Sequence, residues 1–68
     1  MVDTKLLKAK MILEDVTTKD IAESLDLTCD AVRRKVRGSS FFSLEQAQAM
    51  KKILNLTDEE FQSIFFSE

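Results

Sequence analysis

Histidine, tryptophan, tyrosine and proline are absent from this sequence of 68 residues, and glycine and cysteine each occur once. Without histidine and with only Cys29, the chain lacks the ligands of the common zinc sites and cannot form an internal disulfide. It also has no glycine-rich loop of the kind that binds phosphates. We therefore expect no metal, no cofactor, no small-molecule ligand and no enzymatic activity.

Long apolar runs are missing as well. The longest contain two or three residues, such as Met11-Ile12-Leu13 and Ile64-Phe65-Phe66, whereas about 20 are needed to span a bilayer. The sequence shows no secretory signal, and a lone cysteine is typical of reducing compartments. We expect a cytoplasmic protein that does not associate with membranes.

Neither sign of charge is in large excess, but the charged residues are unevenly distributed along the chain. The net charge of −2 is unlike that of a typical basic nucleic-acid-binding domain. Residues 1–42 carry eight basic and seven acidic groups, whereas residues 43–68 carry two basic and five acidic groups. Four of the five residues from Arg33 to Arg37 are basic. A polyanion should therefore bind at this cluster.

The composition, 44% hydrophobic and 32% charged, fits a single folded domain over residues 1–68. Capping residues and apolar periodicity predict that it is all α-helical. The five expected helices cover about 4–14, Thr18–Leu25, Cys29–Arg37, 44–55 and Asp58–Phe65, and Gly38 ends the third. In the first helix, Leu6, Ala9 and Leu13 share one face, which Leu7 and Met11 widen. In the fifth, Phe61, Ile64 and Phe65 form the buried face.

The second and third expected helices form a pattern of their own. Only Asp26 and Leu27 separate them, Ala22 is small enough for a close crossing, and Thr28 caps the second of the pair, whose Val32 faces the core. Two short helices joined by a tight turn, the second with a basic face, suit binding in the major groove of DNA. This segment predicts a helix-turn-helix.

At these residues the sequence resembles the Cro and repressor-type helix-turn-helix family of phages and bacteria. The matching segments are residues 17–28, Val32 to Gly38, Ser43-Leu44 and Leu56 to Glu60, so that the resemblance extends over nearly the whole chain. It implies a compact five-helix bundle of the lambda-repressor-like type. It also implies a transcriptional regulator that binds a pseudo-palindromic operator in double-stranded DNA as a homodimer, in a bacterial or phage-infected cell.

Three positions depart from the family pattern. Thr18 stands where the family often has glutamine, Asp26 replaces the common turn glycine, and Lys35 replaces an apolar residue. Aspartate tolerates the left-handed conformation better than most residues, and Val36 supplies the buried group one position later. The departures leave the expected fold intact and affect the DNA site.

Four residues at the exposed face or leading turn of the third helix are candidates to read bases: Arg34, Arg33, Asp30 and Cys29. Arg34 is the first choice, because a guanidinium can donate to guanine O6 and N7 together. Asp30 could accept from cytosine N4, repel phosphate or pair with an arginine. Cys29 is either a redox-sensitive thiol near the helix start or, preferably, a small side chain that fits the groove.

A second group should position the protein on the phosphate backbone. It comprises Thr18, Lys19, Thr28, Lys35, Arg37, Ser39 and Ser40. The resemblance implies that Phe42 joins the core. Phe41, together with Phe65 or Phe66, should then form an apolar surface near the position where these domains dimerise; the alternative is that all of them pack internally.

Two other functions fit the same pattern. One is a helix-turn-helix that binds a protein, as a phage antirepressor does, which the net acidity and Asp30 allow. The other is an excisionase or an architectural factor that bends DNA. Salt-dependent DNA binding would separate the first from a repressor, and bending of the bound fragment would identify the second.

Overall fold

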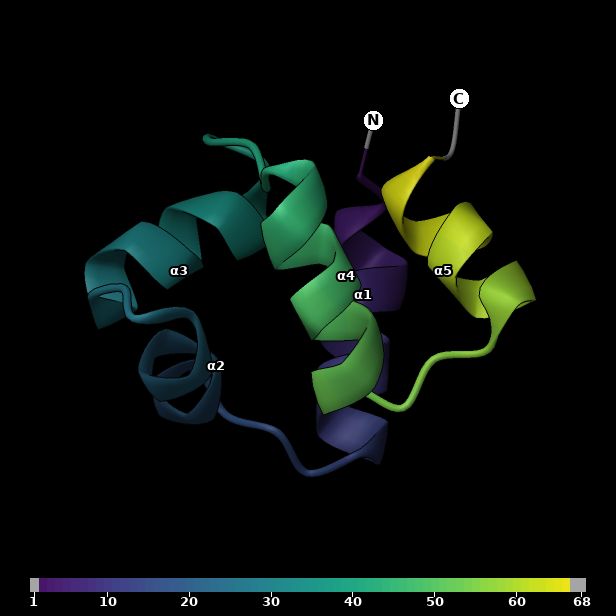
Figure 1. Cartoon of the computed structure of the whole chain (residues 1–68), viewed down its shortest axis with the longest axis horizontal. Coiled ribbons are helices and arrows are strands. Elements are labelled where there is room, and N and C mark those ends of the chain that lie inside the picture. The colour runs from purple at the N-terminus through teal and green to yellow at the C-terminus, as the bar shows by residue number, and fades with distance from the viewer. Residues whose placement is uncertain (1, 67–68) are drawn as a thin grey trace.

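The computed structural model describes residues 2–66, which form five α-helices and no strand (Figure 1). They are α1 (Thr4–Leu13), α2 (Thr18–Leu25), α3 (Cys29–Arg37), α4 (Leu44–Ile53) and α5 (Asp58–Phe65). The expectation of an all-α chain is confirmed. The bounds of α2, α3 and α5 are as predicted, and α1 and α4 end one and two residues earlier than expected.

Each helix begins at a side chain that accepts a hydrogen bond from a backbone N–H of the first turn, which would otherwise lack a partner. The capping residues are Asp3, Thr17, Thr28, Ser43 and Thr57. In α2, α4 and α5 the third helical residue also accepts from the backbone N–H of the cap, which completes a capping box. These pairs explain why the helix starts could be predicted from the sequence.

α1 to α4 are each followed by a residue with a positive φ, one position after α2 and α3 and two positions after α1 and α4. These residues are Asp15 (56°), Asp26 (57°), Gly38 (90°) and Asn55 (53°). After α1, for example, the N–H of Val16 donates to the carbonyl of Met11 at 2.9 Å, as in a Schellman motif. Aspartate and asparagine thus replace glycine at three of these four positions.

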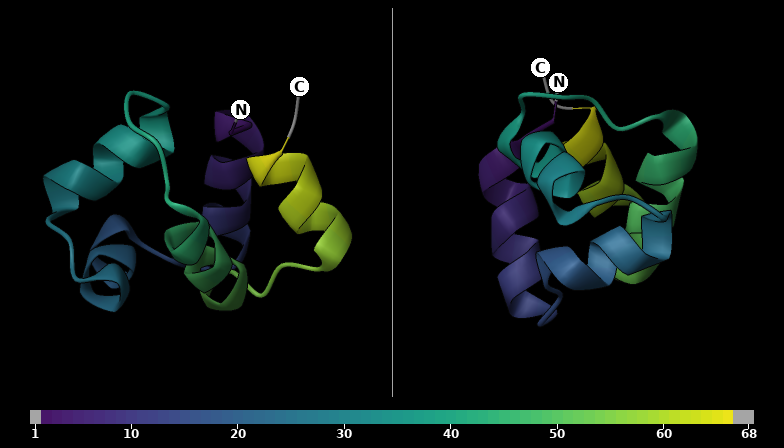
Figure 2. Two further views of the ribbon diagram at one scale, coloured as in Figure 1. Left: turned by 45° about the horizontal axis from the view of Figure 1, so that its top comes forward. Right: turned by 90° about the vertical axis from the view of Figure 1, so that its left-hand side faces the viewer.

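The core lies where the helices meet, and its fully buried side chains include Leu7, Ile21, Val32, Met50 and Leu54. α2 packs against α3 and α4, and α1 packs against α3 and α5. The right-hand view of Figure 2 faces the α2 and α3 pair. Ala22 of α2 is buried, at 5% exposure, in the helix that packs against α3. This burial agrees with the expectation that a small residue is needed at the crossing of the two helices.

The apolar face predicted for α1 is only partly right. Leu7 and Met11 are buried, whereas Leu6, Ala9 and Leu13 are exposed, Leu13 by 73%. α1 has α3 and α5 as its neighbours, and only the side that carries Leu7 and Met11 is enclosed. Both stripes are apolar and both follow the helical period, so periodicity alone could not distinguish the buried stripe from the exposed one.

Phenylalanines fill the space between α5 and the segment that precedes α4. The ring centroids of Phe42 and Phe65 are 5.5 Å apart in an edge-to-face contact, and those of Phe61 and Phe65 are 5.3 Å apart. Phe65 is only 6% exposed, as its place on the buried face predicted for α5 requires, so of the two alternatives for the apolar surface only Phe66 is exposed. Phe41 and Phe66 are exposed by 83% and 51%.

Candidate nucleic-acid interface

The α3 helix separates an apolar side from a charged one. Val32 and Val36, four residues apart, are buried in the core. Arg34, midway between them in sequence, therefore projects from the opposite side of the helix, because two residues turn the helix by about 200°. Its side chain is exposed. Among the four residues predicted to read bases, Arg34 occupies the centre of the exposed face.

Arg33 and Asp30 lie one turn apart on the exposed part of α3. The guanidinium Nη1 of Arg33 is 3.3 Å from the carboxylate Oδ1 of Asp30, and both side chains are largely exposed. Asp30 was expected to accept from cytosine, to repel phosphate or to pair with an arginine, and the structure contains the third of these contacts. Such a contact orients the Arg33 side chain but adds little to stability at the surface.

Cys29 and Thr28 form the start of α3. The Thr28 hydroxyl accepts from the N–H of Ala31 at 3.1 Å, and it retains its own proton as a donor. Cys29 is half-buried and packs against the edge of the core. This contact places Cys29 at the edge of the core, and its fit to the groove of DNA stays a prediction.

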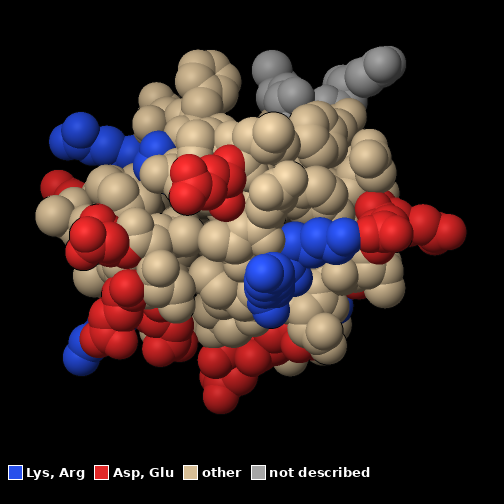
Figure 3. Space-filling view, viewed as in Figure 1, with Lys and Arg blue, Asp and Glu red and all other residues tan. Residues whose placement is uncertain are grey.

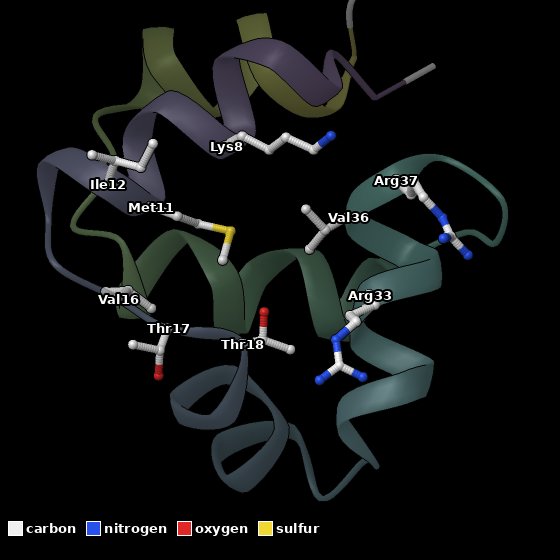
Figure 4. A pocket seen from close by; sticks show the side chains of 9 residues that line it. All are labelled: Lys8, Met11, Ile12, Val16, Thr17, Thr18, Arg33, Val36 and Arg37. Atoms are coloured by element: carbon white, nitrogen blue, oxygen red, sulfur yellow. The ribbon is translucent and has the colours of Figure 1, made fainter.

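A groove with a cationic border lies between α1, α3 and the start of α2 (Figure 4). Its volume is about 520 Å³. Nine residues line this cationic groove: Lys8, Met11, Ile12, Val16, Thr17, Thr18, Arg33, Val36 and Arg37. In Figure 4, Met11 and Val36 point toward each other, Lys8 extends from α1 toward α3, and Arg33 points toward Thr18. The groove therefore adjoins the exposed face of α3.

The start of α2 forms one border of the cationic groove. Thr17 caps α2, and its backbone N–H donates to the Asp20 carboxylate at 2.9 Å while the Asp20 N–H donates to the Thr17 hydroxyl at 3.2 Å. The first of these hydrogen bonds, from the Thr17 N–H to the carboxylate, lowers the pKa of Asp20. Thr18 thus stands in the first turn of α2 next to the groove, and Lys19 follows it, exposed.

The segment after α3 is held against the helix. The N–H groups of Ser39 and Ser40 donate to the carbonyl of Arg34, at 2.9 and 3.2 Å. The Lys35 ammonium donates to the carbonyl of Phe41 at 2.6 Å and lies 6.0 Å from the centre of the Phe42 ring. Lys35 therefore stabilises this connection, and its contact with phosphate stays a prediction.

The face of the molecule on which α4 lies carries both signs of charge (Figure 3). Lys51 of α4 forms an ion pair with Asp58 at the start of α5, which lowers the pKa of Asp58. Its neighbour Lys52 is exposed. A mixed surface attracts a polyanion less than a cationic one, so this side is the less suitable one for DNA.

Lys8 is the residue of this region that sequence reasoning missed. It lies on α1, whereas Arg33 and Arg37 lie on α3, and all three border the same groove. Nothing in the spacing of Lys8 relates it to α3, because the contact depends on how α1 packs. The one available signal was its position three residues before Met11, on the side of α1 that carries the core residue.

Within residues 2–66, no helix is long and apolar enough to cross a membrane. The same residues contain no group of three or more Cys, Asp or Glu side chains arranged to hold a metal ion. Comparisons of the chain with protein family models, with curated proteins and with solved structures found no match.

Proposed function

We propose that this chain is a sequence-specific DNA-binding regulator of transcription, similar to Cro and related repressors, and that α3 enters the major groove. The observation that carries the proposal is the exposed face of α3. It presents Arg33, Arg34 and Arg37 on a helix whose other side is anchored by Val32 and Val36. A helix in the major groove needs this combination of a fixed apolar side and a free side with donors.

The neighbouring elements support the same orientation. Thr18 and Lys19 lie in the first turn of α2, and Ser39 follows the end of α3. These residues therefore flank the pair of helices in the sequence. Hydroxyl groups, lysines and backbone N–H groups in such places suit phosphate oxygens, which position a protein without reading sequence. The proposal assigns base reading to Arg34 and Arg33, and phosphate contacts to this group and Arg37.

A homodimer is part of the proposal. Phe41, Leu44 and Phe66 are exposed by 83%, 64% and 51%, and they border one shallow hollow of about 250 Å³ between α4 and α5. Several large apolar side chains on one surface are typical of an interface. A two-fold dimer would present two α3 helices to a pseudo-palindromic operator.

The test is a salt titration of binding to double-stranded DNA. Each phosphate contact releases counterions, so the logarithm of affinity should fall linearly and steeply with the logarithm of salt concentration. Arg34→Ala should weaken binding to a preferred duplex by about 10- to 100-fold, the value of one good contact to a base. Lys52→Ala, an exposed cation on α4, is the matched control and should bind as the unmodified chain does.

Absence of binding to every duplex would contradict the proposal. So would an equal loss of affinity in the Arg34 and Lys52 variants, because charge alone would then explain binding.

A further inference from the structure

The floor of the cationic groove is apolar and open to solvent. Met11 and Val36 form its deepest part, and Ile12 and Val16 continue it outward along α1 and the segment that follows. Ile12 is 80% exposed. An apolar side chain left in water at the border of a groove contributes nothing to the fold. An occupant that buries this apolar floor would therefore gain binding free energy.

The charged side chains that line the groove have one sign, although the carboxylates of Asp20 and Asp30 bind to Thr17 and Arg33 next to it. Among residues 2–66, every charged side chain that lines it is a cation: Lys8 on the α1 wall, and Arg33 and Arg37 on the α3 wall. Within this range Arg33 pairs with Asp30, whereas Lys8 and Arg37 form no ion pair. The cations thus stand on both sides of the apolar floor.

This arrangement fits an occupant with an apolar ridge between two rows of carboxylates. A DNA backbone offers phosphates to the cations but no comparable apolar ridge for Ile12, Met11 and Val16. An amphipathic helix supplies such a ridge from positions i, i+3, i+4 and i+7 when it lies in a groove. Glutamates on its two flanks would then face Lys8 on one wall and Arg37 on the other.

We propose that the cationic groove binds an acidic amphipathic helix of a partner protein, and that this helix competes with DNA. The competition rests on the proposed function, because the groove shares Thr18, Arg33 and Arg37 with the predicted DNA contacts. Docking of the helix does not depend on DNA binding. A bound helix covers these cations and places its carboxylates where phosphates would lie, and it thereby releases the regulator from its operator.

The test uses the full chain and a fluorescein-labelled synthetic helix of about 15 residues, long enough to form about four turns. Leucines form its ridge and glutamates both flanks; a second peptide has glutamine in place of every glutamate. Fluorescence anisotropy should show binding of the acidic peptide and at least tenfold weaker binding of the neutral one. The affinity of the acidic peptide should fall with increasing salt.

Two variants of the groove and one control locate the site. Lys8→Glu and Ile12→Ser should each weaken binding of the acidic peptide by about tenfold or more, as loss of one significant contact does. Leu13→Ser is the matched control, because Leu13 is similarly exposed on α1 but does not line the groove. It should leave the affinity unchanged. Circular dichroism checks that all three variants stay folded.

The outcomes separate this inference from the proposed function. Failure of the acidic peptide to bind, or equal effects of the Ile12 and Leu13 variants, overturns the docking site whether or not the chain binds DNA. Peptide binding at the groove without any DNA binding supports the docking site and contradicts the proposed function. If a preferred duplex and the peptide bind together without weakening each other, the competition is wrong.

Discussion

At the scale of single residues, Lys10 shows how a charge can be placed between two helices. Its ammonium is 3.1 Å from the Glu60 carboxylate of α5 and 3.8 Å from the Glu14 carboxylate, and the lysine side chain is only 15% exposed. Glu60 also accepts from the N–H of Thr57 at 2.9 Å. The Thr57 N–H and the Lys10 ammonium lower the pKa of Glu60.

This pair predicts a pH dependence of stability. Because the pKa of Glu60 is lower in the folded chain than in the unfolded one, the unfolded chain takes up the proton first as the pH falls. The stabilisation is therefore present above the ordinary glutamate pKa of about 4.3 and is lost as the pH falls below it, through the lowered pKa of the folded chain. Urea denaturation at a series of pH values should show the free energy of unfolding decreasing over this window.

The Glu60→Gln variant tests whether Glu60 causes part of the decrease of the free energy of unfolding in acid. Glutamine keeps an oxygen that can accept from the Thr57 N–H, but it does not titrate and does not pair with Lys10. The decrease of the free energy of unfolding with acid should be shallower in this variant. It should not vanish, because the pKa values of Asp20 and Asp58 are also lowered. An unchanged acid dependence would contradict the assignment.

Single residues also show where prediction from sequence succeeds. Asp26 was expected to tolerate a left-handed turn, and its φ is 57°. Gly38 was expected to end α3, and it does so with φ 90°, where an added Cβ would also lie 3.3 Å from Thr4. Both depend on local backbone chemistry. Lys8 could not be assigned, because its place beside α3 depends on tertiary packing.

At the scale of elements, α1 offers a direct test of which face is buried. Leu7→Ala should lower the free energy of unfolding by about 2–5 kcal/mol, because Leu7 is fully buried and its truncation leaves a cavity. Leu13→Ala, on the exposed stripe, should change it by less than about 0.5 kcal/mol. Thermal denaturation of the two variants measures the difference. Equal effects would mean that α1 packs through the face first expected from the sequence.

Helix starts were more predictable than helix faces, for a physical reason. A cap such as Thr57 and its partner Glu60 is completed within four residues, so its signal is wholly contained in the local sequence. The burial of Leu7 instead of Leu6 depends on α3 and α5, which are distant in sequence. Phe65 differs from Leu6: the periodicity of α5 predicted its burial, whereas its contact with Phe42 depends on the segment before α4.

At the scale of the whole molecule, the cationic groove and a second, apolar surface lie at different places. Lys8, Arg33 and Arg37 border the cationic groove, whereas Phe41, Leu44 and Phe66 form an apolar surface around a different hollow. The face drawn in Figure 3 carries charges of both signs. The acidic C-terminal third of the sequence thus contributes to the core and to this apolar surface, and the proposed contact with a polyanion is assigned to α3.

Such a division predicts the outcome of one experiment on the intact protein. Selection of bound fragments from a pool of random DNA duplexes tests binding, sequence preference and symmetry together. The account predicts enrichment of an inverted repeat whose half-sites are centred about one helical turn apart, with a guanine position that loses its preference in the Arg34→Ala variant. Recovery of fragments without any shared sequence, or of none above background, would contradict the central claim that α3 reads an operator.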